Sequence, residues 1–417
     1  MSSASISASA APVRIRLSRD DIVLRTALVV IIALLAVAVV FPLYSLLSMS
    51  LQDMDGEYVG LENFRIYFDT PALFASITNS LSVAISATLI VLGIAFVYAY
   101  ALTRTRMPLR WFFRGVALIP ILAPSLLAAI SLIYWFGNQG VLKSWLGGGS
   151  IYGPVGIIIG SCFWVFPHAL MILLTALSTA DARLYEAAEA LRTPKWRVFW
   201  TVTLPGAKYG ILSAGFVVFT LVITDFGVPK VIGGRYNVLA TDVYKQVVGQ
   251  QNFEMGAVVS LVLLLPALVA FIADRWVQRK QVALLSARAV PYQPKSEPLR
   301  DGLLFIFCTI VAVTLLAMIA MAAYASFVTF WPYNLTLSLK NYNFDVMDGG
   351  GWEAYFNSIR MAIYCAIFGT GLIFVGGYLV EKARGVSWLR TLLHFTAMLP
   401  LAVPGLVLGI AYIFFFN

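Results

Sequence analysis

Long uninterrupted apolar runs constrain this chain more than any other feature, because a run of about 20 apolar residues can cross the hydrocarbon core of a bilayer. Hydrophobic residues make up 60% of the 417 residues and charged residues only 12%, which is unlike the balance of a soluble domain. The candidate spans cover residues 26–49, 79–103, 111–136, 151–178, 207–229, 256–276, 303–329, 357–381 and 389–416.

Each of these runs must be a helix, because lipid offers no partners to unpaired backbone N–H and C=O groups. The sequence therefore predicts an all-α polytopic membrane protein with about nine transmembrane helices. The first run is too long for the core of a signal peptide and is kept as a helix. Residues 1–22, rich in small and polar residues, are predicted to form a disordered cytoplasmic tail.

Lys and Arg collect on one side of the predicted spans, and cytoplasmic segments carry such a positive excess. The amino terminus is therefore predicted to be cytoplasmic. The net charge of +9 follows from this topology, so no nucleic-acid partner is needed. The basic residues assigned to the cytoplasmic side include Arg16, Arg25, Arg104, Arg110, Arg114, Arg183, Arg197, Arg275, Arg300, Lys382 and Arg390.

An internal repeat joins the two ends of the chain. The strings LENFRIYF and TNSLSVAISATLIVLG return as LKNYNFDV and FNSIRMAIYCAIFGTG. Such self-similarity indicates duplication. The matched pairs are Asn63 with Asn341, Asn79 with Asn357, Pro120 with Pro400, and Pro124 with Pro404.

The first copy continues beyond the matched region, whereas the second ends at residue 417. We therefore expect one complete six-helix unit over residues 23–280, a cytoplasmic linker over 281–302, and the first three helices of a truncated second unit over 303–417. The alternative is a second copy that evolved to be short.

A charged island, YEAAEALRTPKWRVFWTVTLP, lies between two predicted spans at residues 185–205. Ser178 and Asp181 have the spacing of a helix cap, and the pattern predicts a helix over residues 181–192. Thr193 and Pro194 then suit the start of a second short helix, which Pro205 is predicted to end. An apolar stripe on the first helix consists of Leu184, Ala187, Ala188 and Leu191.

The island resembles the EAA loop of permease subunits of binding-protein-dependent ABC importers. In that family the loop forms coupling helices that sit in a groove of the ATP-binding subunit. The glycine of the family motif falls on Arg192, so the turn is expected to rest on Thr193 and Pro194. The alternative is an interfacial amphipathic helix with no partner. The predicted coupling residues are Tyr185, Glu186, Ala187, Ala188, Leu191, Arg192, Thr193, Pro194, Leu204 and Pro205.

The resemblance implies a permease of the bacterial inner membrane that works with a dimer of ATP-binding subunits and a periplasmic solute-binding protein. Two fused copies resemble the ferric-iron-type branch. The string ITDFGVPKVIGG looks most like permeases for 2-aminoethylphosphonate, so that solute is favoured and ferric iron is the alternative. The chain has no GxxxxGK[ST] pattern, so ATP is expected to be hydrolysed by another subunit, with no cofactor bound here.

Five further residues are candidates for the translocation path. Asp225 is an ionisable residue at the end of a predicted span, although exposure at the interface would explain it equally well. Four prolines would kink their helices, and such kinks either line a path or only serve packing. These are Pro120, Pro124, Pro400 and Pro404.

Two other classes compete with the importer. An ion-coupled secondary carrier would need ionisable residues in mid-span, and it would leave the island unexplained. An intramembrane enzyme would need a nucleophile with a base, or a metal cluster. Cys162, Cys308 and Cys365 lie in apolar runs, and they predict neither a metal site nor a disulfide framework. The sequence therefore predicts no catalytic residue.

Overall fold

The computed structural model describes residues 19–284, 290, 292–346, 350–383 and 385–416, without the side chains of 280–284. Helices account for 80% of it, as predicted. Residues 1–18 of the predicted tail and residues 285–289 and 291 of the predicted linker lie outside this description. The tail prediction is wrong for its last four residues, because α1 (Arg19–Leu35) already begins there.

Seven helices in the described part of the chain are long and apolar enough to cross a membrane, and two bent pairs bring the number to nine. The first span, Arg19–Ser50, joins α1, η1 (Ala36–Val40) and α2 (Phe41–Ser50). The others are α4 (Pro71–Arg104), α7 (Pro154–Ser178), the α9–α10 helix (Lys195–Ile223), α13 (Phe253–Leu284), α14 (Pro298–Phe327) and the α15–α16 helix (Gly351–Lys382).

The predicted spans over residues 111–136 and 389–416 are broken instead of continuous. The helix Arg110–Leu122, made of α5 (Arg110–Leu118) and η2 (Ile119–Leu122), meets α6 (Ser125–Phe136) at 102°. The pair α17 (Ser387–Ala402) and α18 (Gly405–Phe416) is bent by 109°. Prolines lack the N–H of the helical ladder. The matched prolines thus do more than kink, since they lie beside the break in both copies.

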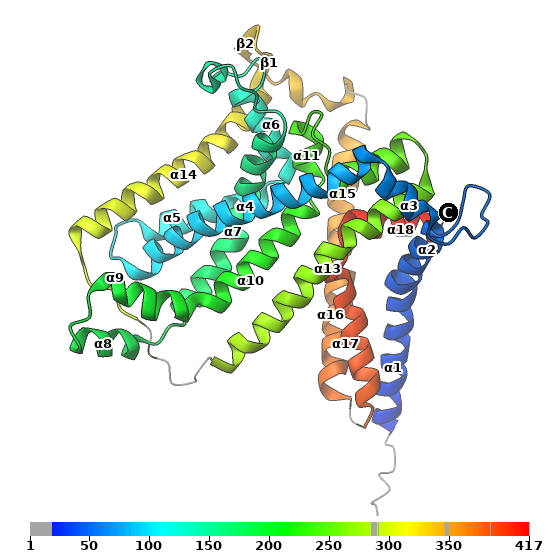
Figure 1. The fold of residues 1–417 in the computed structure, drawn as a ribbon, viewed down its shortest axis with the longest axis horizontal. Coiled ribbons are helices and arrows are strands. Elements are labelled where there is room, and N and C mark those ends of the chain that lie inside the picture. Colours follow the sequence, from blue (N-terminus) through cyan, green and yellow to red (C-terminus); the bar gives the residue numbers. More distant parts are fainter. Residues whose placement is uncertain (1–18, 285–289, 291, 347–349, 384, 417) are drawn as a thin grey trace, which may run out of the picture. The chain divides into compact units, whose positions relative to one another are not determined.

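The described residues form two compact units. One unit lies within residues 1–42 and 352–400, and the other lies within 43–351 and 401–417. In the first unit, Leu28 and Ile31 of α1 pack with Leu379 of α16 (Thr370–Lys382) and Leu393 of α17. In the second, α14 packs against α4, α5 and α6 (Figure 1). Each unit thus combines the first helix of one copy with later helices of the other.

Small residues allow close packing in the core of the second unit. α4 packs against α7 and α10 (Leu204–Ile223), and α10 also contacts α13. Ala84, Ala87 and Ala95 of α4 are fully buried. At Gly210 of α10, an added Cβ would lie 2.3 Å from the Cβ of Ala176. Such close approach supplies the van der Waals contact that stabilises helix pairs in membranes.

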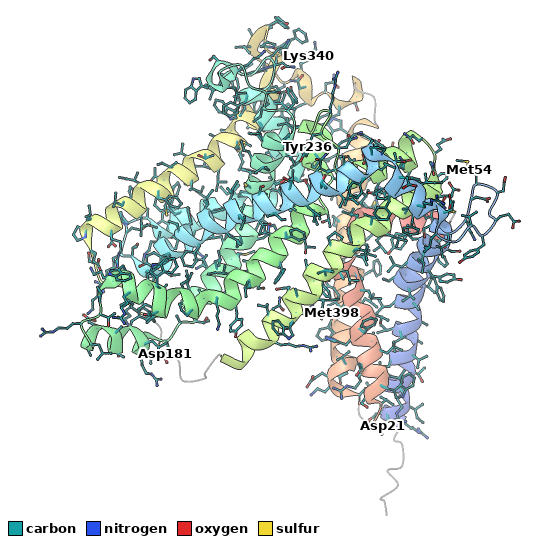
Figure 2. The ribbon with its side chains drawn as sticks, in the orientation of Figure 1. Asp21, Met54, Asp181, Tyr236, Lys340 and Met398 are labelled. Carbon is teal, nitrogen blue, oxygen red and sulfur yellow. The ribbon has the colours of Figure 1, made fainter. Side chains whose placement is uncertain are left out.

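The matched asparagines Asn63 and Asn341 make equivalent contacts. The Asn63 side chain donates to the carbonyls of Ser50 and Gln52 at 3.1 and 2.7 Å. That of Asn341 donates to those of Ser326 and Val328 at 3.2 and 2.7 Å. Both asparagines thereby close the chain back onto the end of the preceding span. Figure 2 labels Lys340, the residue before Asn341 in the sequence.

Short elements complete the described chain. The short helices are α3 (Glu62–Asp69), η3 (Lys143–Leu146), α11 (Gly227–Ile232), α12 (Leu239–Tyr244), η5 (Lys245–Gly249), η6 (Lys340–Tyr342) and η7 (Phe344–Val346). An antiparallel hairpin pairs β1 (Val328–Phe330) with β2 (Asn334–Leu337). The π-helical turn η8 (Cys365–Gly369) joins α15 (Gly351–Tyr364) to α16.

Candidate functional site

The charged island forms the connection between α7 and α10, and it begins with α8 (Ala182–Ala190). The Asp181 carboxylate accepts a hydrogen bond from the Arg183 backbone N–H at 3.1 Å and so caps the helix. Ser178 has a different partner, because its hydroxyl donates to the Thr175 carbonyl. The first predicted helix is therefore confirmed within two residues at each end, and its cap is Asp181 alone.

The turn after α8 rests on Arg192, and the prediction that it would rest on Thr193 and Pro194 is wrong. Arg192 has a φ of +51°. Its N–H bonds the Glu189 carbonyl at 2.8 Å, and the Thr193 N–H bonds the Ala188 carbonyl at 2.9 Å. This is the Schellman pattern, which places a left-handed residue, usually glycine, directly after the helix. The backbone thus explains why a glycine suits this position.

The second predicted helix does not end at Pro205. After Pro194 the chain forms α9 (Lys195–Val198), a π-helical turn η4 (Phe199–Thr203) and then α10, which count together as one span, Lys195–Ile223. Pro205 lies in the first turn of α10. In the π-helical turn the Leu204 N–H bonds the Phe199 carbonyl, so the hydrogen-bond register has already changed where the proline N–H is missing.

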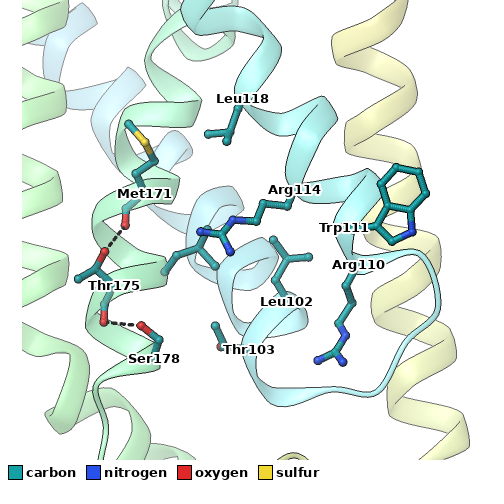
Figure 3. Close-up of a pocket in the computed structure, with 10 residues that line it drawn as sticks. Leu102, Thr103, Arg110, Trp111, Arg114, Leu118, Met171, Thr175 and Ser178 are labelled. Atoms are coloured by element: carbon teal, nitrogen blue, oxygen red, sulfur yellow. Dashed lines mark hydrogen bonds between the residues drawn. The ribbon is translucent and has the colours of Figure 1, made fainter. Parts of the chain in front are cut away.

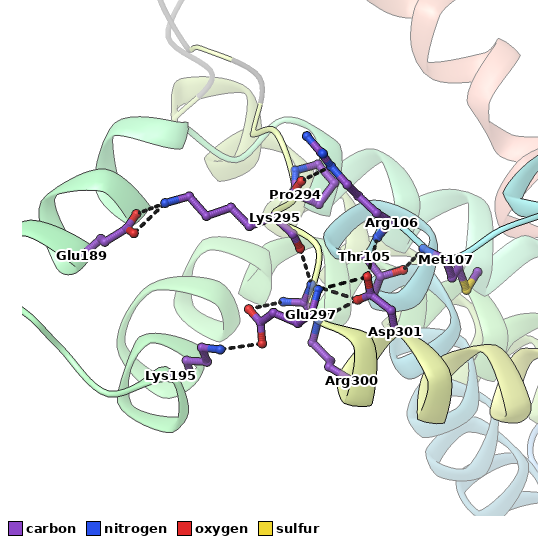
Figure 4. Close-up of polar contacts among 10 residues, drawn as sticks. All are labelled: Thr105, Arg106, Met107, Glu189, Lys195, Pro294, Lys295, Glu297, Arg300 and Asp301. Atoms are coloured by element: carbon purple, nitrogen blue, oxygen red, sulfur yellow. Dashed lines mark hydrogen bonds and ion pairs between the residues drawn. The ribbon is translucent and has the colours of Figure 1, made fainter.

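A linker strand, which we define as residues 290 and 292–297, lies along one face of this loop (Figure 4). The Val290 carbonyl accepts from the Ala182 N–H at 2.9 Å. The Lys295 ammonium bonds both carboxylate oxygens of Glu189 at 2.5 and 2.7 Å, which raises the pKa of Lys295. Lys195 pairs with Glu297 at 2.5 Å. The strand therefore spans both short helices of the loop.

A buried arginine joins the loop, the linker strand and the end of α4. Arg104 is only 3% exposed and donates to the Leu177 carbonyl at 2.7 Å. Its guanidinium lies 5.1 Å from the Tyr185 ring centroid and 4.7 Å from that of Tyr292, within cation–π range. The Tyr185 hydroxyl also donates to Thr203 at 3.1 Å. The Tyr185 ring also lies 4.6 Å from the Tyr292 ring, centroid to centroid, so Tyr185 contacts Arg104, Thr203 and Tyr292.

The linker strand continues into α14 and is tied to the loop between α4 and α5. The Arg106 guanidinium donates to the Pro294 carbonyl at 2.7 Å, and its backbone N–H donates to Asp301 at 3.3 Å. Arg300 donates to Asp301 and Glu297 at 3.0 Å. The loop between α4 and α5, the linker strand and the first turn of α14 therefore share one polar network.

The opposite face of the loop is open and apolar. Leu191 is 80% exposed, Trp196 68% and Leu184 58%. Of the predicted stripe only Ala188 is buried, because the linker strand packs on the other face of α8. Glu186 and Ala187 are also exposed. We call Leu184, Ala187 and Leu191, which follow one another along α8, the open face; Trp196 is a further exposed residue, on α9.

Asp225 binds backbone and hydroxyl groups at a helix start. Its carboxylate accepts from the N–H groups of Gly227 and Val228 at 3.2 and 3.0 Å, and from the Ser125 hydroxyl at 3.0 Å. Ser125 directly follows Pro124 and begins α6. A Cβ at Gly227 would lie 2.4 Å from the Ser125 Oγ. Asp225 therefore fixes α11 against the bent pair, which gives it and Pro124 a positioning role; Pro120 lies in η2 before the break.

In the second copy, Pro400 lies inside α17, and the carbonyl of Pro404 accepts the Leu408 N–H at the start of α18. The four prolines thus lie at the two breaks, and their place on a translocation path stays a prediction.

Sequence reasoning missed two buried acids. Asp242 of α12 accepts a hydrogen bond from the Ser76 hydroxyl and lies 4.0 Å from the Lys245 ammonium. Asp274 of α13 accepts from Ser213 at 2.6 Å and from Gln278 at 2.7 Å. Neither follows from a local pattern, because the partners lie on other helices or outside the apolar run. Each oxygen of the Asp274 carboxylate accepts a hydrogen bond from a neutral group, as is usual for a buried polar side chain.

Several known proteins are similar to this chain in sequence or in fold. Residues 92–282 match the family described as the binding-protein-dependent transport system inner membrane component. The chain is 27% identical over 97% of its length to a Haemophilus influenzae protein named for a ferric transport system permease. It is 26% identical over 97% to the ferric transport system permease protein of Actinobacillus pleuropneumoniae. The chain spans 65% and 60% of the length of these relatives.

A protein of Salmonella typhi named for 2-aminoethylphosphonate transport is 25% identical over 61% of the chain and 92% of that relative. Among solved structures, the chain resembles a bacterial alginate ABC transporter in complex with an alginate pentasaccharide-bound periplasmic protein. The TM-score is 0.50 at 14% identity, covering 63% of this chain and 96% of that chain. This likeness supports the fold alone.

Proposed function

We propose that this chain forms the membrane path of an ATP-driven importer, because residues 92–282 match the binding-protein-dependent transport family. The observation that carries the proposal is the open face at the position of the EAA motif. It leaves Leu184 and Leu191 exposed with no covering residue among those described. Exposed apolar side chains grouped on one surface mark a site for a protein partner.

The coupling step uses this surface as a lever. An ATP-binding subunit would hold the open face, and closure of its dimer on ATP would move α8 and α9. Because α9 continues into α10 without a sharp bend, that movement reaches the transmembrane bundle directly. The linker strand gives a second route, since Lys295 and Glu297 connect both short helices to the start of α14.

The other parts of the proposal follow from this arrangement. ATP is hydrolysed by the partner, and this chain contributes no catalytic residue. A periplasmic binding protein would deliver solute at the opposite side of the membrane, and the amino terminus would be cytoplasmic. Cysteine accessibility of residues placed in α8 and in α3, measured from each side of inverted vesicles, tests the orientation.

The sequence alone favoured 2-aminoethylphosphonate as the transported solute. The comparisons favour ferric iron instead. The ferric relatives align with 97% of the chain, whereas the 2-aminoethylphosphonate relative aligns with 61%. Uptake of radioactive iron and of labelled 2-aminoethylphosphonate, by cells that carry the complete transporter, separates the two. Uptake of 2-aminoethylphosphonate alone would reverse this preference.

Charge reversal at Glu186 tests the coupling role. Glu186 is exposed in the middle of α8, so Glu186→Lys should leave folding and membrane insertion intact. We expect it to lower ATP hydrolysis stimulated by the binding protein in the reconstituted transporter. Glu381→Lys makes the same charge change at another exposed glutamate and should leave that stimulation unchanged. Equal stimulation in the Glu186→Lys and wild-type transporters would contradict the proposal.

A further inference from the structure

A pocket of about 490 Å³ lies between α4, α5 and α7, outside the coupling loop. Figure 3 shows its walls, with Leu102 and Thr103 on α4, Arg114 and Leu118 on α5, and Met171 and Thr175 on α7. The α4 residues belong to the last turn before the Arg104 terminus, and Ser178 ends α7. The pocket therefore lies at the end of these spans that the basic residues assign to the cytoplasm.

Positive charge in the pocket comes from two arginines one helical turn apart on α5. The Arg110 guanidinium donates one hydrogen bond to the Thr105 carbonyl at 3.2 Å. Its other N–H groups remain available to a ligand. The Arg114 guanidinium points into the space between α5 and α7 (Figure 3), and no described residue is bonded to it. No acidic side chain is among the residues that line the pocket. The charge of the site is therefore open to an anion.

The hydroxyl groups nearby do not compete for that role. Thr175 donates to the Met171 carbonyl at 2.9 Å, and Ser178 donates to the Thr175 carbonyl at 3.0 Å. Their protons are already used within α7. Recognition of an anion thus rests on the guanidinium groups, which suit the oxygens of a phosphate through paired hydrogen bonds.

The remaining wall of the pocket is apolar, and it includes residues farther along α5 and α7 from the cytoplasmic end. Leu102, Leu118, Met171 and Leu174 line the pocket. Trp111, also in the lining, is 77% exposed, and tryptophan is enriched at the level of lipid head groups. A site with arginines at the cytoplasmic end and aliphatic walls toward the bilayer fits a ligand that has an anionic head and hydrocarbon chains.

We propose that this pocket binds an anionic phospholipid of the cytoplasmic leaflet, with the phosphate between Arg110 and Arg114 and an acyl chain along Leu118 and Met171. Basic pockets between transmembrane helices on this side of a membrane hold such head groups. The lipid would fix α5 against α7 beside the bent pair. The proposal does not depend on which solute the chain carries.

The test measures lipid retained by the purified full-length chain in native mass spectrometry. Phosphatidylglycerol and phosphatidylcholine with identical acyl chains are the probes. We expect phosphatidylglycerol to be retained preferentially, and Arg114→Gln to weaken that retention about fivefold, since one surface cation contributes about 1 kcal/mol toward an anionic lipid. Arg110→Gln should have a similar effect.

Arg279→Gln is the matched control, because Arg279 is an exposed arginine of α13 that does not line the pocket. It should leave phosphatidylglycerol retention within twofold of wild type. An equal loss in the control, or equal retention of the two lipids, would overturn the proposal. So would binding of inorganic phosphate that depends on Arg114 while lipid retention does not, because the site would then serve a soluble anion. Circular dichroism verifies that each variant folds.

Discussion

The two copies of the repeat show which features a short sequence fixes and which depend on distant partners. Asn63 and Asn341 make the same pair of backbone contacts. The matched prolines lie beside breaks of 102° and 109°. The carbonyl partners of each asparagine lie 11 to 15 residues before it in the same copy, so each copy contains all the residues that these contacts need.

Burial differs sharply between the same two copies. In an apolar stretch of 18 residues within α4, 39% is buried, whereas the corresponding share in the α15–α16 helix is 6%. α4 packs against α7 and α10, which come from later in the first copy. Asn79 likewise donates to the Asn237 carbonyl at 2.9 Å, whereas its match Asn357 is exposed. Packing therefore belongs to the assembled unit and not to the repeated sequence.

The largest expected difference is between Arg104 and Lys382, which occupy matched ends of α4 and α16. Arg104→Ala removes a cation that contacts two rings and its hydrogen bond to the Leu177 carbonyl, which should cost about 2–3 kcal/mol. Lys382 is exposed, so Lys382→Ala should change the free energy of unfolding by less than about 0.5 kcal/mol. Denaturant titration in detergent measures the free energy of unfolding of both variants. Similar losses in the two variants would contradict the expected difference between the copies.

The shared asparagine contacts predict equal effects. Asn63→Ala and Asn341→Ala each remove two hydrogen bonds to partly buried carbonyls, at a cost of about 1–2 kcal/mol apiece. Thermal unfolding in detergent should show matching decreases in the two variants. A loss in one copy alone would mean that the contacts are equivalent in geometry but not in energy.

The turn at Arg192 predicts a smaller change of opposite sign. A non-glycine residue in the left-handed region is strained, so Arg192→Gly should relieve the φ of +51° and stabilise the turn by about 1 kcal/mol. Slower amide hydrogen exchange in α8 is the measurement. Arg183→Gly, inside α8, is the control and should accelerate exchange, because glycine weakens a helix interior. Faster exchange in Arg192→Gly would show that the Arg192 side chain stabilises the turn.

Sequence alone predicted the helical class, the positions of the spans and the short helix α8 after α7, because hydropathy and capping patterns are local. It placed the Arg192 turn one residue too late, because Thr193 and Pro194 are stronger turn residues by composition. It could not find the contacts of Arg104 with Tyr292 or of Glu189 with Lys295, since these join residues from distant parts of the chain. The exchange of first helices between the two copies was equally invisible to local patterns.

We propose that the open face of the first copy docks the ATP-binding subunit. Leu184→Asp combined with Leu191→Asp places charges on two exposed side chains, so the fold should survive. Leu61→Asp, at a similarly exposed leucine before α3, is the control. Detergent co-purification of the ATP-binding subunit measures docking directly. We expect the double variant to lose the ATP-binding subunit and the control variant to retain all of it. Full retention in both would contradict the proposal.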